Sequence, residues 1–182
     1  GAPLFARYNV ESWLRHSGGR CDVVLVNSSN VRTYIPDMPP EWPRLYLAAK
    51  SDVIRYALIY HHGGIYMDSD FLVVQDLGPV LREAATREFV SYENDGQNCR
   101  KGSFSSNFMG GRKGSRVHRK IWKAQKAVLV DHCPPKKRTE ARLCCYDNPR
   151  KDCHVPWAGI GERVSSPVLK RLLKNGSVDL HC

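Results

Sequence analysis

The 182-residue sequence predicts one α/β layered domain with a mostly parallel sheet. Three observations support this prediction. Short apolar runs alternate with amphipathic segments, which is the pattern of strands and helices packed in layers. Apolar residues make up 42% of the chain, enough to form a single core at this length. The sequence also lacks any run of about eighteen apolar residues, the length that would cross a membrane.

The first half of the chain predicts a helix, a buried strand and a second helix. The stretch LFARYNVESWLRHSG (residues 4–18) is amphipathic, and Gly18 and Gly19 stop it. CDVVLVN (21–27) is a continuous apolar run typical of a strand buried on both faces. MPPEWP (38–43) breaks the chain. The second helix runs from about Leu45 to His61 and ends before Gly63, and its predicted apolar stripe comprises Leu47, Ile54, Ala57 and Leu58.

The second half continues the alternation. GIYMDSD (64–70) predicts a strand that ends in two carboxylates, and REFVSYEN (87–94) and SFSSNFMGG (103–111) predict further strands. SRVHRKIWKAQKAVLVDH (115–132) predicts a basic helix, followed by a long irregular stretch in residues 134–153. VPWAGIGERVSSPVLKRLLKNG (155–176) predicts a loop that leads into a final helix. In such layered folds ligands bind beyond the carboxyl ends of the strands.

The net charge of +10 is concentrated in one segment. Between Arg112 and Lys151 there are 13 Lys or Arg and 3 acidic residues, so 13 − 3 = +10 lies there and the rest of the chain is balanced. We interpret residues 112–154 as a basic, Cys-rich insertion within a single domain that spans 1–182. Such a segment is either a solvated surface or a binding site for nucleic acid, acidic glycans, anionic membrane or a phosphorylated substrate.

Four of the seven cysteines gather in this segment, and they are Cys133, Cys144, Cys145 and Cys153. Disulfides in an oxidising compartment explain the clustering best. Zinc is the alternative, with His132 and His154 beside the cluster, but the segment has no C-x-x-C pair. Two glycosylation sequons, which begin at Asn27 and Asn175, are compatible with a lumenal chain.

The carboxylates of GIYMDSD are the first candidates for a chemical role. If Asp68 and Asp70 lie on a strand, their side chains project to the same face. Two such carboxylates suit Mg²⁺ or Mn²⁺, with substrate phosphates and waters as further ligands. In the preceding helix Asp52 and Arg55 are three residues apart and share a face, which would place a second polar group opposite the carboxylates. Gly63 and Gly64 allow the sharp turn between the two.

Residues 51–77, SDVIRYALIYHHGGIYMDSDFLVVQDL, resemble the DXD sugar-binding region of a retaining glycosyltransferase family. The family pattern is S-D-x-x-R-Y-x-x-L, a spacer, then G-G-x-Y-x-D-x-D. Its fixed positions in this sequence are Ser51, Asp52, Arg55, Tyr56, Gly63, Gly64, Tyr66, Asp68 and Asp70, whereas Ile59 stands at the relaxed ninth position. Asp22 to Asn27, the strand carrying Asn107 and Val155 to Glu162 are weaker similarities. The opening strand of the family is missing before Gly1, so we expect a truncated domain.

The resemblance implies a GT-A, or nucleotide-diphospho-sugar transferase, fold that retains anomeric configuration. The implied substrates are a UDP- or GDP-sugar with Mn²⁺ or Mg²⁺, and a glycan, glycolipid or protein acceptor of the hexose. By position, Asp70 coordinates the metal, and Asp68 contacts the ribose or sugar and the metal through water. Asp52 and Arg55 contact sugar and phosphate, while Tyr66 and Asn107 join the donor site. His181 or His118 is a further candidate metal ligand.

Two other classes of function remain open on the residues alone. A phosphatase of the haloacid-dehalogenase type also uses D-x-D after a strand, with the first Asp as nucleophile, although Phe71 and Leu72 depart from its pattern. A non-catalytic module could bind an anionic ligand through the basic segment, but its few aromatics do not favour nucleic acid. We expect a Golgi or other secretory location, membrane association only through segments outside this chain, and structural roles for His61 and His62.

Overall fold

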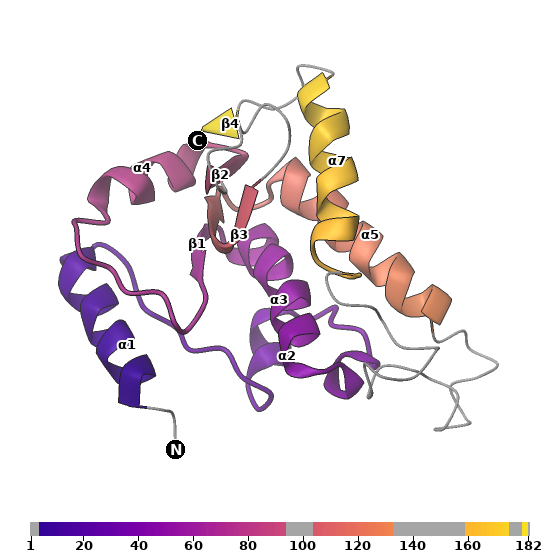
Figure 1. The fold of residues 1–182 in the computed structure, drawn as a ribbon, viewed down its shortest axis with the longest axis horizontal. Coiled ribbons are helices and arrows are strands. Elements are labelled where there is room, and N and C mark those ends of the chain that lie inside the picture. The colour runs from indigo at the N-terminus through magenta and orange to yellow at the C-terminus, as the bar shows by residue number, and fades with distance from the viewer. Residues whose placement is uncertain (1–3, 94–103, 133–158, 175–179, 182) are drawn as a thin grey trace.

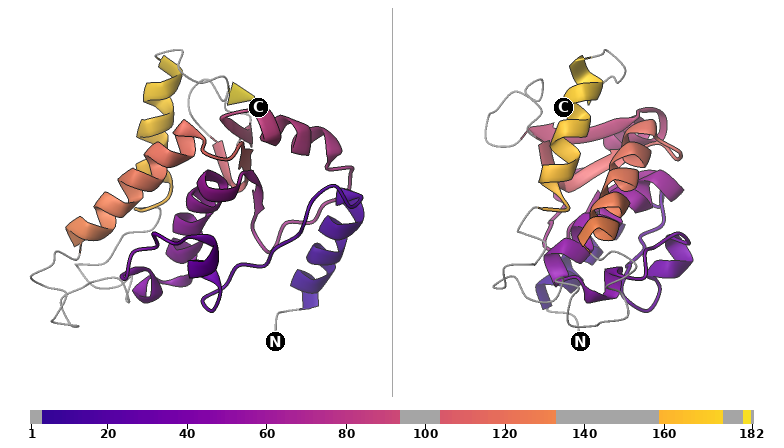
Figure 2. Two further views of the ribbon diagram at one scale, coloured as in Figure 1. Left: turned by 180° about the vertical axis from the view of Figure 1, so that it is seen from behind. Right: turned by 90° about the vertical axis from the view of Figure 1, so that its right-hand side faces the viewer.

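A four-stranded sheet lies between two groups of helices in the computed structural model of the chain (Figure 1). The structure describes residues 4–93, 104–132, 159–174 and 180–181. The helices α1 (Leu4–Ser17) and α4 (Gly78–Thr86) lie on one side of the sheet. On the other side lie α3 (Leu47–His62), α5 (Arg116–His132) and α7 (Glu162–Lys174). Figure 2 shows the same separation from behind.

The sheet has the order β1-β3-β2-β4, and two of its three pairings are antiparallel. Its strands are β1 (Gly64–Met67), β2 (Phe89–Glu93), β3 (Phe104–Gly111) and β4 (Leu180–His181). β3 pairs antiparallel with both β1 and β2, and β2 pairs parallel with β4. The mixed α/β fold is therefore present, whereas a mostly parallel sheet is not confirmed. Only residues 94–103 separate β2 from β3, and a parallel crossover needs a dozen or more residues.

The strand predicted in residues 21–27 does not form within the described part of the chain. This segment joins no ladder among the described strands, and Val24 and Leu25 are 47% and 56% exposed. Its local hydrogen bonds belong instead to the turn that follows, where the Asn30 side chain donates to the Leu25 carbonyl at 2.9 Å. An apolar run indicates the capacity for burial on two faces, but a strand also requires a neighbour that supplies the hydrogen bonds.

The helices predicted around residues 4–17 and 45–61 are confirmed, with their ends at glycines. Gly18 has φ 57° and Gly63 has φ 74°, and a glycine adopts this left-handed conformation at little cost. The predicted apolar stripe of α3 is wrong at Leu47, which is 83% exposed. The buried positions are instead on two faces, because α3 packs between α5 and the sheet. They comprise Ala49, Val53, Arg55, Tyr56, Ala57 and Ile59.

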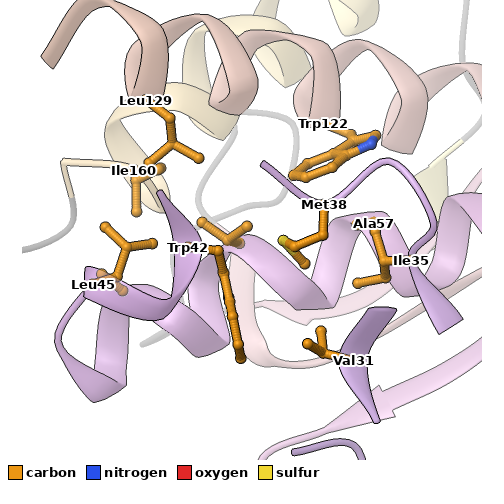
Figure 3. Close-up of a cluster of buried hydrophobic side chains, with 11 residues drawn as sticks. Val31, Ile35, Met38, Trp42, Leu45, Ala57, Trp122, Leu129 and Ile160 are labelled. Carbon is orange, nitrogen blue, oxygen red and sulfur yellow. The ribbon is translucent and has the colours of Figure 1, made fainter. Parts of the chain in front are cut away.

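A hydrophobic cluster joins α2 (Val31–Tyr34), the 3-10 helix η1 (Trp42–Arg44), α3 and α5 (Figure 3). Trp42 and Trp122 are 4% and 1% exposed in it, and Ile160, just before α7, is fully buried. The cluster comprises Val31, Ile35, Met38, Trp42, Leu45, Ala49, Val53, Ala57, Trp122, Leu129 and Ile160. The first part of the predicted basic segment is therefore a core helix, with Arg119, Lys120 and Lys123 exposed on its outer face.

Four of the predicted disulfide partners, Cys133, Cys144, Cys145 and Cys153, lie outside the described residues. Within the described part of the chain, Cys21 is a free thiol. No helix among the described residues has the length and apolar character needed to cross a membrane.

Candidate functional site

The D-x-D motif lies in a turn that begins where β1 ends. The last strand residue is Met67, and the Asp68 amide still donates to the Asn107 carbonyl of β3 at 2.8 Å. The Phe71 amide then donates to the Asp68 carbonyl at 3.0 Å and closes the turn over Ser69 and Asp70. The two carboxylates are therefore not on one face of a strand as predicted, because the ladder stops before Asp70.

Asp68 is held by two side chains from the same side of the sheet. Its Oδ1 atom accepts a hydrogen bond of 2.5 Å from the Tyr66 hydroxyl and lies 3.6 Å from the Arg55 guanidinium. The Arg55 guanidinium also lies over the Tyr66 ring, 5.2 Å from its centre. Burial, together with the negative charge of Asp68, raises the pKa of Tyr66 above its usual value. The phenol is therefore a neutral donor to the Asp68 carboxylate.

Arg55 is buried at 4% exposure, and its guanidinium contacts protein groups. It donates to the Ser106 carbonyl at 2.6 Å, to the Ser51 carbonyl at 3.2 Å and to the Ser51 hydroxyl at 3.2 Å. It also lies 3.0 Å from Asp52, as the spacing of three residues predicts. A buried guanidinium needs several such partners, because a buried cation without them would lose its hydration and gain nothing in return. Arg55 thus joins α3, β3 and the end of β1.

Asp52 lies against the turn of residues 159–161, which precedes α7. A Cβ atom on Gly161 would come within 2.5 Å of the Asp52 carboxylate, so the two segments are in close contact. Gln125, which is fully buried, donates at 2.8 Å to the carbonyls of both Asp52 and Ile160 and fixes this approach. Burial raises the pKa of Asp52, and the nearby Asp68 charge adds to the rise, while Arg55 opposes it.

Asn107 lies beside the motif on β3, where its carbonyl accepts from the Asp68 amide. Its side-chain oxygen accepts hydrogen bonds from the Tyr92 hydroxyl at 2.7 Å and the Ser105 hydroxyl at 2.5 Å. These two donors orient the amide group. Within the described residues the side-chain NH₂ of Asn107 makes no hydrogen bond, so it can donate to a ligand beside Asp68.

Asp70 is exposed, and no described residue pairs with its carboxylate. The second oxygen of Asp68 likewise makes no hydrogen bond to the described residues, since Oδ1 takes both contacts. Carboxylate oxygens are the ligands that Mg²⁺ and Mn²⁺ prefer, and such ions often take one or two protein carboxylates with phosphates and water. These two residues fit such an ion. No group of three or more His, Cys, Asp or Glu suited to a metal occurs in the described residues.

Helix α1 also contacts the motif, which the sequence did not predict. The Asn9 amide donates to the Ser69 carbonyl at 2.9 Å, and the Trp13 indole donates to the Phe71 carbonyl at 2.6 Å. Local patterns carry no signal for contacts 60 and 58 residues apart. Asn9 is only 7% exposed, and a buried polar side chain of this kind needs a hydrogen-bond partner, which the Ser69 carbonyl supplies.

The two histidines predicted as candidate metal ligands are His118 and His181, whereas His61 and His62 were expected to have structural roles. His118 is fully buried, stacks on Phe89 and has its Nδ1 atom 2.9 Å from the Ser115 hydroxyl, which makes it a residue of the core. The backbone of His181 belongs to β4, and its side chain is not among those described. His61 contacts Asp37 at 2.7 Å and His62 contacts the Tyr34 carbonyl at 2.7 Å, which gives both structural partners.

Comparison with known proteins gives two matches. Residues 5–87, from α1 through α4, match the family model described as "glycosyltransferase sugar-binding region containing DXD motif". The chain is also 37% identical over 54 residues to inositol phosphoceramide mannosyltransferase 1 of Schizosaccharomyces pombe. That similarity covers 28% of this chain and 17% of the yeast protein. No solved structure is significantly similar to the chain.

Proposed function

We propose that the protein transfers a hexose from a nucleotide-diphosphate sugar, because residues 5–87 match the model of a glycosyltransferase sugar-binding region containing a DXD motif. The donor is a UDP- or GDP-sugar, and the acceptor is a glycan, a glycolipid or a protein. Transfer depends on Mn²⁺ or Mg²⁺ and retains the configuration at the anomeric carbon. The chain covers 17% of the length of its yeast relative, so these properties are proposed for the whole protein.

The contrast between the two carboxylates of the motif is the observation that supports this proposal. Asp68 is fixed by Tyr66 and Arg55, while Asp70 is exposed in the turn that follows β1, without a partner among the described residues. An unpaired exposed carboxylate beside an anchored one is the arrangement expected of a site completed by a cation and a diphosphate. Such a cation supplies the positive charge that stabilises the departing diphosphate.

In this proposal the residues of the chain divide the work between binding and positioning. Asp70 and the second oxygen of Asp68 hold the cation. Asn107 donates its side-chain NH₂ to the donor sugar, and Asp52 accepts from a sugar or ribose hydroxyl. The hydrogen-bonding groups of Arg55 are directed at protein atoms, so Arg55 acts by holding the carboxylates of Asp52 and Asp68. Tyr66 orients Asp68.

The yeast relative is named for mannose transfer to inositol phosphoceramide. Within the proposal, this puts GDP-mannose first among donors to screen and phosphosphingolipids first among acceptors. Location in the Golgi or another secretory compartment is part of the same proposal. It is supported by the sequons at Asn27 and Asn175 and by the cysteine cluster. Asn27 is exposed, as an acceptor of glycosylation must be.

The proposal is tested by donor binding and hydrolysis. Thermal shift with UDP- and GDP-sugars should show stabilisation that requires Mn²⁺ for at least one donor. Asp70→Asn should abolish the metal-dependent stabilisation and the slow hydrolysis of that donor, while its melting temperature without ligand stays at the wild-type value. The matched control is Asp76→Asn, which alters an exposed carboxylate on the same segment that pairs with Arg20. Asp76→Asn should keep both the metal-dependent stabilisation by the donor and the slow hydrolysis of that donor.

Three outcomes would count against the proposal. Wild-type turnover in Asp70→Asn would remove the metal site from the mechanism. Release of inorganic phosphate from a phosphomonoester, without a sugar nucleotide, would favour a phosphatase. Salt-sensitive binding of an anionic glycan that survives loss of both motif carboxylates would favour a binding module.

A further inference from the structure

We propose that α1 is the positioning element of the D-x-D turn and that Asn9 and Trp13 are the positioning residues for Asp70. The inference rests on the proposed function, because it concerns how the chain holds a carboxylate that binds the cation. Neither side chain touches the proposed ligands. Both act on the backbone that carries Asp70.

The two side chains hold the carbonyl groups on either side of Asp70. Asn9 donates to the Ser69 carbonyl at 2.9 Å, and Trp13 donates to the Phe71 carbonyl at 2.6 Å. Both side chains are largely removed from solvent, with Asn9 7% and Trp13 5% exposed. A buried donor that loses its acceptor is costly, so each bond restricts where the turn can lie.

The contacts continue along the same face of α1 beyond the turn. The Ser12 hydroxyl accepts from the Val73 amide at 3.1 Å, and the His16 carbonyl accepts from the Leu77 amide at 3.0 Å. Contacts at positions 9, 12, 13 and 16 follow the three- and four-residue spacing of one helix face. The segment from Ser69 to Leu77 therefore runs beside α1, which acts as a rigid support for it.

Asp70 needs such a support because the sheet does not provide one. The β1 ladder ends at Met67, and within the turn itself the Phe71 amide bonds to the Asp68 carbonyl. The Asp70 side chain has no partner among the described residues that would fix it. A carboxylate on a mobile turn loses conformational entropy when it binds a cation, whereas one on a fixed turn has already been ordered by folding.

Packing and hydrogen bonding can be separated at Trp13. Its ring packs with Val73 and Leu77 in a cluster between α1 and the segment after the motif. Trp13→Phe keeps an aromatic ring and removes the N–H donor. Asn9→Ala removes the amide donor. Ser17→Ala is the matched control on the same helix, because the buried Ser17 hydroxyl donates to the Leu14 carbonyl within α1.

The first measurement is the dissociation constant of Mn²⁺ in the presence of UDP and, in a separate titration, of GDP. Free Mn²⁺ is followed by electron paramagnetic resonance. We expect Asn9→Ala to raise the dissociation constant about tenfold, the lower end of the range for groups that orient metal ligands. Trp13→Phe should also raise the dissociation constant, and Ser17→Ala should leave it at the wild-type value.

The second measurement is hydrogen exchange at the Phe71 amide in the metal-free protein, which a general loss of stability would not change selectively. Asn9→Ala should speed this exchange while the Met109 amide in the sheet stays protected. Equal Mn²⁺ affinity in wild type and Asn9→Ala would overturn the inference. A loss of affinity with unchanged Phe71 exchange would also overturn it, because the turn would not be the cause.

The proposed metal site and the proposed positioning role of α1 can be refuted separately. If the wild-type chain binds Mn²⁺ no better than Asp70→Asn, the metal site of the proposed function is wrong, and the positioning role of α1 is wrong with it. If wild type and Asp70→Asn differ but Asn9→Ala and Trp13→Phe behave as wild type, the metal site stands and the role of α1 alone is refuted.

Discussion

The Arg55 guanidinium lies 3.0 Å from the Asp52 carboxylate, and the two side chains are 5% and 18% exposed. Asp68 lies 3.6 Å from the same guanidinium. One cation thus stabilises two carboxylates that come from α3 and from the end of β1. Removing this cation would leave two negative charges in a partly buried site, where their repulsion is weakly screened.

Arg55→Met should lower the free energy of unfolding by about 3 kcal/mol, as expected when one partner of a buried ion pair is removed. The Ser106 carbonyl would also lose its donor. Arg55→Lys should recover only part of the loss, because an ammonium group lacks the planar fork that reaches several acceptors. Urea unfolding at neutral pH measures both changes.

A surface ion pair provides the control for this prediction. Arg20 pairs with Asp76, and their side chains are 46% and 61% exposed. Arg20→Met should cost less than about 1 kcal/mol, since water and salt screen exposed pairs. Equal losses in Arg20→Met and Arg55→Met would show that the buried network does not stabilise the fold as the structure indicates.

Gly161→Ala should impair the site more than the fold. The new methyl group would come within 2.5 Å of the Asp52 carboxylate, so the carboxylate has to move relative to Arg55. We expect a stability loss of about 1–3 kcal/mol from overpacking. We expect up to about a hundredfold loss of kcat/KM for donor hydrolysis, because small displacements of positioned groups are costly. Enzyme kinetics and urea unfolding separate the two effects.

A double-mutant cycle identifies the cause of that loss. In an Asp52→Ala background the carboxylate is gone, so adding Gly161→Ala should have little further effect on kcat/KM. The same loss in both backgrounds would mean that the alanine acts through a different contact.

The order and type of most elements could be predicted from the sequence. Amphipathic periodicity predicted α1, α3 and α5, and the glycines that follow α1 and α3 marked their ends. The spacing of Asp52 and Arg55 predicted their contact, because both belong to one helix. These predictions succeed because each depends on neighbours within a few residues.

The sheet and the support of the motif could not be predicted in the same way. Residues 22–27 carry the apolar run of a buried strand, yet no described strand pairs with them, because a run does not specify its partner. The turn at Asp70, the contacts from Asn9 and Trp13 and the approach of Gly161 to Asp52 all join distant parts of the chain. Local periodicity contains no information on such contacts.

The lowered pKa of buried His118 should make the protein less stable as the pH falls below neutral. Burial lowers the pKa of His118 from 6.5 to about 3, although the neighbouring Glu88 opposes the shift. Between these values the unfolded state binds one more proton than the folded state. The free energy of unfolding therefore falls as pH falls, with a slope that approaches about 1.4 kcal/mol per pH unit. Urea unfolding between pH 7 and pH 5 measures it.

Two variants separate the titration of His118 from its packing. His118→Phe retains a ring against Phe89 but cannot bind a proton. The free energy of unfolding of this variant should therefore depend little on pH between pH 6.5 and pH 5, whether the variant is more or less stable than wild type. Phe89→Leu removes the stacked ring and keeps the imidazole, so it should lower stability yet preserve the slope. Hydrogen bonds from Arg116 and Arg112 keep the pKa of the neighbouring Glu88 below its usual value in spite of its partial burial. A wild-type slope in His118→Phe would therefore assign the pH dependence to another group.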